Sequence, residues 1–277
     1  MKNHAIMTNI IVAFCLINFC VLDAQRYLVG YNLTYKPSST SDDTISKNYF
    51  LEIQNNKSIF RSEIRRQSDS LTQVTGYGLG FPNSFNEQIC IISDLITQEN
   101  LKYVVSPTSR DRFYIPITEE LNWKILTNTT KIANYNCQKA EVSYGNRKWT
   151  AWFTTEVPIL QGPYIFHGLP GLIIQISDSE NNFNFILKSI KKYNNTELYP
   201  PSNGTVISWD NFEKIQQDYY DDPFSFVKAN NIKTVKDDGH GGYAKTNFRE
   251  LALMTRKGIL ENDNTIELDK MIFYKKK

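Results

Sequence analysis

Glu156 and His167 stand eleven residues apart and form the candidate catalytic pair of this sequence. A partly buried carboxylate can have a raised pKa and act as a general acid or base, and a nearby imidazole would complete the site of a hydrolase. Glu156 also follows an aromatic run and precedes Pro158. We therefore favour the competing interpretation, in which its carboxylate accepts backbone hydrogen bonds at a strand end.

Signatures of common enzymes and metal sites are missing from the sequence. It contains no HExxH, no GxSxG and no phosphate-binding loop with its Lys-Ser/Thr pair. Beyond the N-terminal segment only His167 and His240 remain, so three histidines cannot bind one zinc ion. Asp237, Asp238 and His240 could hold a divalent ion, but such glycine-rich stretches are more often solvated loops. We expect no metal and no cofactor, and we lean against an enzyme.

Aromatic residues are the second kind of candidate site. Trp149, Trp152, Tyr164 and Phe166 lie close together in the sequence. Side chains alternate along a strand, so Trp149 and Trp152 point to opposite faces of the sheet. One set can belong to the core while the other lines a concavity, and we expect these four residues to bind a small apolar or peptide-like ligand there.

The segment that holds these aromatic residues is rich in glycine and proline. Pro158 and Pro163 lack an N–H group and end strand pairing. Pro170 and Gly171 suit the centre of a type II turn, in which glycine adopts the positive φ. The pattern predicts a rigid connector that leads two hairpins into one core.

The same segment resembles the GLPGLI family of exported Bacteroidetes envelope proteins. The name motif consists here of Gly168, Leu169, Pro170, Gly171, Leu172 and Ile173, and residues 135–140, 149–154, 156, 158 and 162–164 match in order. The resemblance covers about residues 47–198 and implies an exported protein of uncharacterised biochemistry. His167 stands where a small residue is common in that family, which counts against a shared catalytic histidine. A more distant similarity is to bowl-like β domains used for binding or as appendages of secreted enzymes.

The N-terminus has the pattern of a signal peptide. Lys2 precedes an almost wholly apolar run over residues 10–22, and Ala24 is a suitable cleavage point. The run is about a dozen residues long, against roughly 20 for a membrane-spanning helix. We expect residues 1–24 to be removed and the chain to reach the periplasm, the cell surface or the extracellular space. No later run has spanning length, so an integral membrane protein is not expected.

Cysteine usage fits an oxidising compartment. Cys15 and Cys20 would leave with the signal peptide, and Cys90 and Cys137 would remain. We predict a disulfide between them, which would close a loop of about 48 residues and stabilise the fold by roughly 4 kcal/mol. The alternative is two buried free thiols.

Composition predicts a mainly β fold. The chain is 41% hydrophobic and 13% aromatic, which is ample for a packed core rich in strands. We expect a single domain over residues 25–277, less regular from about 200, with one antiparallel curved sheet or open, bowl-like barrel and one or two accessory helices. The formal net charge is +2 and the basic residues are scattered, so a nucleic-acid partner is not expected.

Periodicity gives the individual elements. Alternation and turn residues predict strands over residues 26–35, 48–54, 58–61, 87–92, 101–105, 112–116, 123–126, 138–144, 147–154, 172–177 and 183–190. Helical spacing after Ser208 predicts a helix over 209–219. Residues 65–82 and 233–245 are predicted as loops, and 267–274 as a final strand.

These features favour one function over two others. The first is an exported, non-enzymatic binding or accessory module for an apolar or peptide-like ligand, or for an outer-membrane or periplasmic protein partner. The alternatives are an envelope hydrolase that uses Glu156 with His167, and a structural or assembly factor without a ligand. We rank binding first because the sequence supplies aromatic surface and no recognisable nucleophile and base.

Overall fold

A computed structural model of the chain describes residues 26–192, 198–201, 203–237 and 243–275; the predicted signal peptide lies outside them. The strands of the main sheet are β1 (Arg26–Tyr35), β2 (Ile45–Gln54), β3 (Lys57–Ser62), β4 (Cys90–Asp94), β5 (Glu99–Val105), β6 (Arg112–Ile117), β7 (Lys124–Ile132), β8 (Tyr135–Tyr144), β9 (Arg147–Thr154), β10 (Leu172–Asp178), β11 (Phe183–Lys192) and β12 (Thr205–Val206). A small second sheet pairs β13 (Val235–Asp237) with β14 (Tyr243–Lys245).

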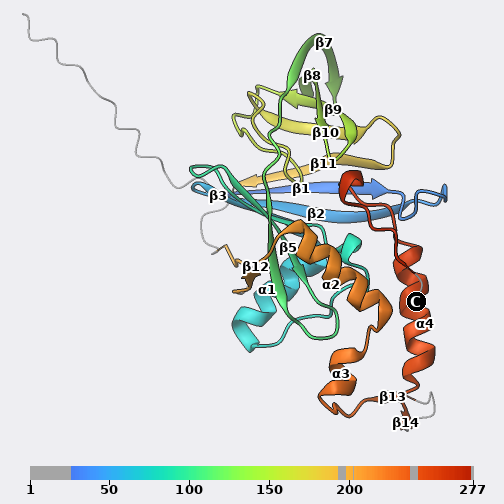
Figure 1. Ribbon diagram of the computed structural model, residues 1–277. Coiled ribbons are helices and arrows are strands. Elements are labelled where there is room, and N and C mark those ends of the chain that lie inside the picture. Colours follow the sequence, from blue (N-terminus) through green and yellow to red (C-terminus); the bar gives the residue numbers. More distant parts are fainter. Residues whose placement is uncertain (1–25, 193–197, 202, 238–242, 276–277) are drawn as a thin grey trace, which may run out of the picture.

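The main sheet has twelve strands in the described part of the chain, in the order β12-β6-β5-β4-β3-β2-β1-β11-β10-β9-β8-β7. Two meanders, β1 to β6 and β7 to β11, meet where β1 pairs with β11, and Figure 1 shows them as the lower and upper parts of the molecule. Neighbouring strands are antiparallel except β12 and β6, which are parallel. The ends β12 and β7 do not pair, so the predicted mainly β, open sheet is confirmed.

Tight turns at the predicted positions set the hairpins. Gly145 and Asn146, between β8 and β9, both have φ of 58°. Two successive positive φ angles define the type I′ turn that matches the twist of paired strands. The backbone of Gly145 also passes close to Glu267: a Cβ added to Gly145 would lie 2.9 Å from the Cα of Glu267. This turn therefore also supports the C-terminal segment.

Four α-helices lie in the described residues, α1 (Glu63–Thr75), α2 (Trp209–Asp221), α3 (Ser225–Ala229) and α4 (Phe248–Leu260), with 3-10 turns η1 (Phe85–Glu87) and η2 (Leu268–Lys270). They gather beside the β1 to β6 meander (Figure 1). The predicted α2 is confirmed, and Ser208 caps it by accepting a hydrogen bond from the N–H of Asn211 at 3.2 Å. One or two accessory helices were expected, and the described residues contain α1, α3 and α4 besides α2.

The predicted loop over residues 65–82 is wrong, because α1 occupies its first part. Ser62 Oγ accepts a hydrogen bond from the N–H of Arg65, and Gly76 ends the helix with φ of 80°. The buried residues of α1 are Ser68 and Asp69. Because the buried face is polar, the sequence lacks the apolar repeat by which an amphipathic helix is recognised.

The C-terminal part differs from the prediction in two further ways. Residues 267–274 contain η2 in place of a strand, because Glu267 turns inward and is bound by side chains of the sheet. The predicted loop over 233–245 contains β13 and β14, and its residues 238–242 lie outside the described part of the chain, as does His240.

The predicted disulfide is absent from the structure. Cys90 and Cys137 are both buried free thiols in the described part of the chain. Cys90 begins β4 and Cys137 belongs to β8, and six strands of the sheet lie between β4 and β8. The disulfide was predicted because two cysteines remain in an oxidising compartment, which says nothing about the distance between them in the fold. A disulfide requires Cα atoms within about 7 Å of each other.

Candidate ligand-binding site

Glu156 and His167, the predicted catalytic pair, have different hydrogen-bond partners. Glu156 is exposed, and its Oε1 accepts hydrogen bonds from the backbone N–H of Asn136 at 2.9 Å and from its Nδ2 at 2.8 Å. This is the strand-end role that we favoured. His167 is partly buried, which lowers its pKa, and its Nε2 lies 3.4 Å from Asn100 Nδ2.

The aromatic residues predicted to bind a ligand lie mainly in the core. Trp149, Tyr164 and Phe166 are buried, and the ring of Phe166 packs 4.7 Å from that of Trp149 and 6.4 Å from that of Tyr164. Trp152 is partly exposed and packs against the edge of the same core. Among the described residues, these four line neither of the concavities presented below. Their observed contacts are those of residues that stabilise the fold, and a role in ligand binding stays a prediction.

The name motif ends the connector between β9 and β10, and its last two residues, Leu172 and Ile173, begin β10. Leu169, Leu172 and Ile173 are buried, whereas Gly168 and Pro170 are exposed. Gly171 has φ of 152°, and a Cβ added there would lie 1.9 Å from the carbonyl oxygen of Thr154. Its N–H donates to Leu169 O at 2.7 Å, so the turn is tighter than the expected type II turn. The motif is a packed corner.

The connector also supplies Tyr164 to a buried polar cluster. The carboxylate of Glu267 accepts hydrogen bonds from the hydroxyls of Tyr144, at 2.8 Å, and Tyr164, and its Oε2 lies 2.8 Å from Lys102 Nζ. Burial alone would raise the pKa of Glu267, but Lys102 and the two hydroxyls hold it below its usual range. The adjoining cavity measures about 10 Å³, room for one water at most. The cluster fastens the C-terminal segment to the sheet.

A larger cavity of about 280 Å³ lies at the N-terminal end of α1, and we call it the α1 cavity. It opens where β3 ends and β4 begins, so one end of the sheet forms its wall. Its lining residues are Lys47, Asn48, Tyr49, Ser62, Glu63, Ile64, Arg65, Gly80, Phe81, Pro82, Glu87, Gln88, Ile89, Cys90 and Tyr103. Small-molecule sites combine such apolar and aromatic walls with a few polar groups, at volumes from about 300 Å³ upward.

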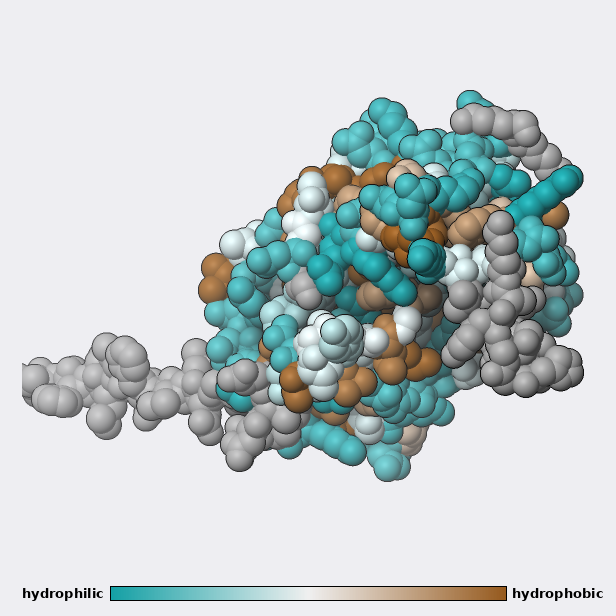
Figure 2. Space-filling view, turned by 90° about the horizontal axis from the view of Figure 1, so that it is seen from below, coloured by the Kyte–Doolittle hydropathy of each residue, from teal (hydrophilic) through white to brown (hydrophobic). Residues whose placement is uncertain are grey.

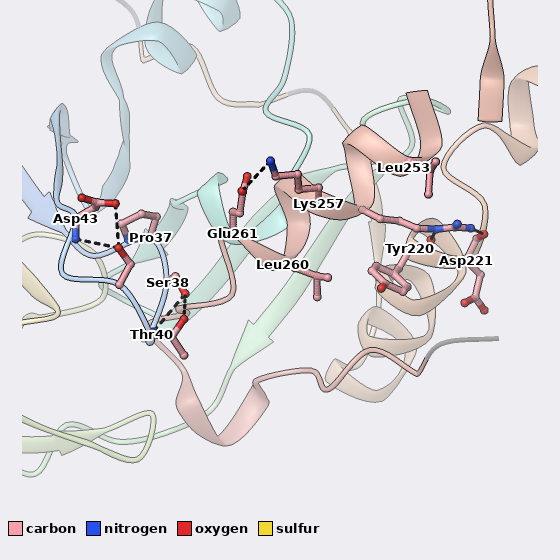
Figure 3. Close-up of a pocket in the computed structure, with 12 residues that line it drawn as sticks. Pro37, Ser38, Thr40, Asp43, Tyr220, Asp221, Leu253, Lys257, Leu260 and Glu261 are labelled. Carbon is pink, nitrogen blue, oxygen red and sulfur yellow. Dashed lines mark hydrogen bonds and ion pairs between the residues drawn. The ribbon is translucent and has the colours of Figure 1, made fainter. Parts of the chain in front are cut away.

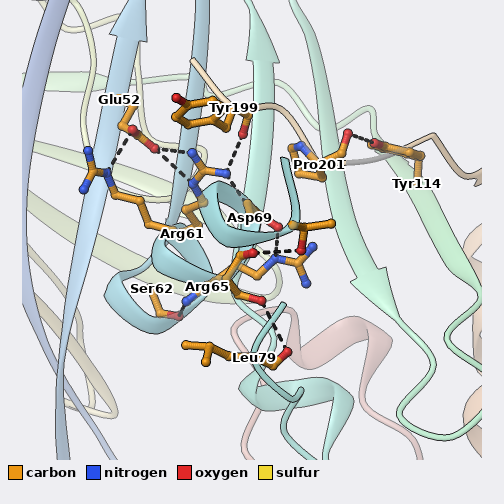
Figure 4. Close-up of polar contacts among 12 residues, drawn as sticks. Glu52, Arg61, Ser62, Arg65, Asp69, Leu79, Tyr114, Tyr199 and Pro201 are labelled. Atoms are coloured by element: carbon orange, nitrogen blue, oxygen red, sulfur yellow. Dashed lines mark hydrogen bonds and ion pairs between the residues drawn. The ribbon is translucent and has the colours of Figure 1, made fainter. Parts of the chain in front are cut away.

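An ion-pair network holds α1 against this wall. Arg61 is fully buried and binds Glu52 at 2.5 Å, Asp69 at 2.6 Å and the carbonyl oxygen of Tyr199 at 2.7 Å (Figure 4). Asp69 also lies 2.8 Å from Arg65 Nε. Buried charges persist only when paired in this way, so the network fixes the position of α1.

Part of the wall of the α1 cavity is aromatic. The guanidinium of Arg65 lies 4.7 Å from the ring centre of Phe81 and 4.8 Å from that of Tyr103. Both arrangements are cation–π contacts that order the rings. Burial raises the pKa of the Cys90 thiol to about 12, so the thiol stays neutral and serves as an apolar wall.

The hydroxyl of Tyr103 is buried beside the guanidinium of Arg65, and its proton has no acceptor among the described residues. Its side chain is 1% exposed. Burial raises the pKa of Tyr103 and the nearby Arg65 opposes this, so the hydroxyl keeps its proton at neutral pH.

A second concavity is a wide groove between the loop of residues 37–43 and helices α2 and α4 (Figure 3). It measures about 850 Å³, and Leu253 and Leu260 give its α4 side an exposed apolar character. Arg256 Nε donates to the carbonyl oxygen of Tyr220 at 2.8 Å, which caps α2. Seen from this helical end, the surface carries hydrophobic patches between hydrophilic areas (Figure 2).

The described residues contain no group of three or more side chains arranged to hold a metal ion. Within the same residues, no helix combines the length and apolar character needed to cross a membrane.

Known proteins resemble this chain over a short stretch of sequence and in fold. A family described as a protein of unknown function (Porph_ging) matches residues 141–175, from β8 through the connector into β10. No curated protein matches. The structure of PNGF-II in a C2 crystal is similar with a TM-score of 0.50 and 15% identity, over 70% of this chain and 33% of that one. Its P21 crystal form gives 0.49 and 15%, over 69% and 33%.

The likeness to the C2 crystal structure of PNGF-II shows a β-rich fold. This chain spans about a third of the length of PNGF-II, and at 15% identity the likeness concerns the fold alone.

Proposed function

We propose that this protein is an exported, non-enzymatic binding module that holds a small, mostly apolar ligand in the α1 cavity. The observation that carries the proposal is a cavity of about 280 Å³ whose lining includes Tyr49, Phe81 and Tyr103. Removal of apolar surface from water supplies the affinity, at about 25 cal/mol per Å².

Export and family membership rest on sequence. Residues 1–24 have the pattern of a cleaved signal peptide, and the connector resembles the GLPGLI family. The family of unknown function that matches residues 141–175 covers the same connector, which supports the proposal that the chain belongs to a family of this kind. The mature chain would be one β-rich domain from residue 25 onward.

The hydrolase alternative has less support. Glu156 is bound to Asn136 and exposed, and Asn100 is the polar neighbour of His167. A protein partner is the better alternative, because the groove beside α4 is wide, and Leu253 and Leu260 are exposed in it.

The test uses mature protein, residues 25–277, and the neutral fluorescent probe N-phenyl-1-naphthylamine. Ile64 lines the α1 cavity and is 64% exposed, so Ile64→Trp narrows the cavity with little effect on folding. We expect the wild type to bind the probe and Ile64→Trp to bind it at least about tenfold more weakly, a change of about 1.4 kcal/mol.

Ile96→Trp is the matched control. Ile96 is 72% exposed in the turn between β4 and β5, away from the residues that line the α1 cavity. It should leave probe binding unchanged. Equal binding by both variants, or no binding by the wild type, would overturn the proposed function.

A further inference from the structure

A third cavity, which we call the arginine pocket, adjoins the α1 cavity. It measures about 250 Å³ and lies between α1, the glycine-rich loop of residues 76–81 and the turn from β5 to β6. Arg65, Gly80 and Phe81 line both cavities, so the two share one boundary.

Gly80 is the open point of this boundary. A Cβ added at Gly80 would have no atom of the described residues within 4 Å, its chain neighbours apart. At Gly78, by contrast, a Cβ would lie 2.6 Å from both Ser68 Oγ and Thr72 Oγ1, and Ser68 Oγ donates to Leu79 O at 3.3 Å. The loop is therefore held against α1, and the free space beside Gly80 leads from one cavity to the other.

Two arginines give the arginine pocket a positive charge. Arg112 begins β6 and Arg110 lies in the turn before it; both line the pocket, and neither forms an ion pair with a carboxylate of the described residues. The guanidinium of Arg110 lies 5.1 Å from the ring centre of Phe81, which is also 4.7 Å from the guanidinium of Arg65. These cation–π contacts order Arg110 beside the boundary of the two cavities.

The nearby carboxylates are already bound. Asp69 lines the pocket, but its Oδ1 lies 2.8 Å from Arg65 Nε and its Oδ2 lies 2.6 Å from Arg61 Nη1. Asp111 lies outside the lining, and its Oδ2 accepts a hydrogen bond from Ser109 Oγ at 2.5 Å. The two positive charges of the pocket are therefore available to an anionic group of a ligand.

We infer, on the basis of the proposed function, that the α1 cavity and the arginine pocket form one site for a single-chain anionic amphiphile. Its apolar chain occupies the α1 cavity, and its carboxylate, sulfate or phosphate head binds Arg110 and Arg112. The planar guanidinium group matches the oxygens of such heads, and hydrogen bonds between opposite charges are the strong ones.

The charges along α1 fix the direction in which this ligand lies. Glu63 lines the α1 cavity in the first turn of α1, and its hydrogen-bond partner is the neutral Asn48 at 3.4 Å. An anionic head at that end would be repelled by Glu63. The partial negative charge at the C-terminal end of α1 opposes the head in the arginine pocket, but it falls off within one turn and is weaker than two charge-assisted hydrogen bonds.

The first experiment removes the two positive charges. Decanoate, below its critical micelle concentration, displaces N-phenyl-1-naphthylamine from mature protein at pH 7.5. We expect the double variant Arg110→Gln, Arg112→Gln to bind decanoate at least about tenfold more weakly than the wild type, and to bind the dye and neutral 1-decanol unchanged. The control is the double variant Lys148→Gln, Arg249→Gln, which removes the same charge at exposed positions outside both cavities.

The outcomes separate the inference from the proposed function. Equal decanoate affinity in the wild type and in Arg110→Gln, Arg112→Gln overturns the inference, as does an equal loss of decanoate and 1-decanol. Binding to phosphatidylglycerol vesicles without binding of free decanoate also overturns it, because the anionic partner would then be a membrane surface. Failure of the wild type to bind the dye refutes the proposed function itself.

The second experiment closes the junction between the cavities. Gly80→Val places a side chain in the free space, and the φ of Gly80 lies outside the left-handed region, so the backbone accepts it. We expect decanoate affinity to fall about tenfold and dye affinity to change less than about twofold. Equal decanoate affinity in Gly80→Val and wild type contradicts a single site that spans both cavities.

Discussion

Lys102 and Glu267 form a buried ion pair whose disruption should strongly destabilise the protein. Their side chains are 8% and 2% exposed, and the two charged atoms are 2.8 Å apart. Lys102→Met removes the cation. The buried carboxylate of Glu267 then keeps the hydroxyls of Tyr144 and Tyr164 as hydrogen-bond donors but has no positive charge to balance it. Breaking a buried pair on one side costs about 3–5 kcal/mol, and we expect a loss in that range at pH 7.

The pH dependence separates a charge effect from lost packing. In the wild type the pKa of Glu267 is lowered, so its contribution is present above the ordinary carboxyl pKa and lost as the pH falls through the folded pKa. In Lys102→Met the two hydroxyls alone oppose the effect of burial, so the pKa of Glu267 rises. Protonation then relieves the variant, so its destabilisation relative to wild type should shrink between pH 7 and pH 4.

Urea unfolding followed by tryptophan fluorescence at both pH values measures these differences. Lys57→Met is the control, because Lys57 is exposed at the start of β3 and should change the free energy of unfolding by less than about 0.5 kcal/mol. A cost of less than about 1 kcal/mol for Lys102→Met at pH 7, or an equal cost at both pH values, would contradict a stabilising role for this ion pair.

Two further predictions concern the connector and the thiols. Gly171→Ala should destabilise the protein by about 3 kcal/mol or more in the same urea assay, because the new Cβ would meet Thr154 O. Gly168→Ala is the control: its Cβ has open space, and with φ of 91° it should cost about 1–2 kcal/mol. Equal costs for the two variants would contradict the packed corner. Thiol titration of denatured, unreduced mature protein should count two free thiols, Cys90 and Cys137, and a count of zero would show a disulfide.

Local patterns predicted the strands well. The predicted bounds of β1 and β9 coincide with the structure, and the turn at Gly145 and Asn146 is where the dipeptide indicated. These elements depend on alternation and turn chemistry, which involve near neighbours in the sequence. For the same reason α2 could be predicted from its Ser208 cap and aromatic spacing.

The candidate site could not be predicted in this way. Tyr49, Ile64, Phe81 and Tyr103 come from four separate segments that meet only in the folded sheet. Alternation showed that Trp149 and Trp152 face opposite sides, but it could not show that the connector covers the Trp149 side. The local signals for α1 were Ser62 as a cap, Gly76 as a stop, and the spacing of Arg65 and Asp69, which suits an i,i+4 ion pair.

The strand order has a consequence for how the chain folds. Within each meander, β1 to β6 and β7 to β11, strands pair with their neighbours in sequence, so these pairings are local compared with a pairing between the two meanders. The pairing of β1 with β11 is different, because it brings Tyr27 to Lys192. Pairing of β1 with β11 is therefore a late step in folding. Until it occurs, β1 and β11 are exposed edge strands that a chaperone or a second chain can pair with.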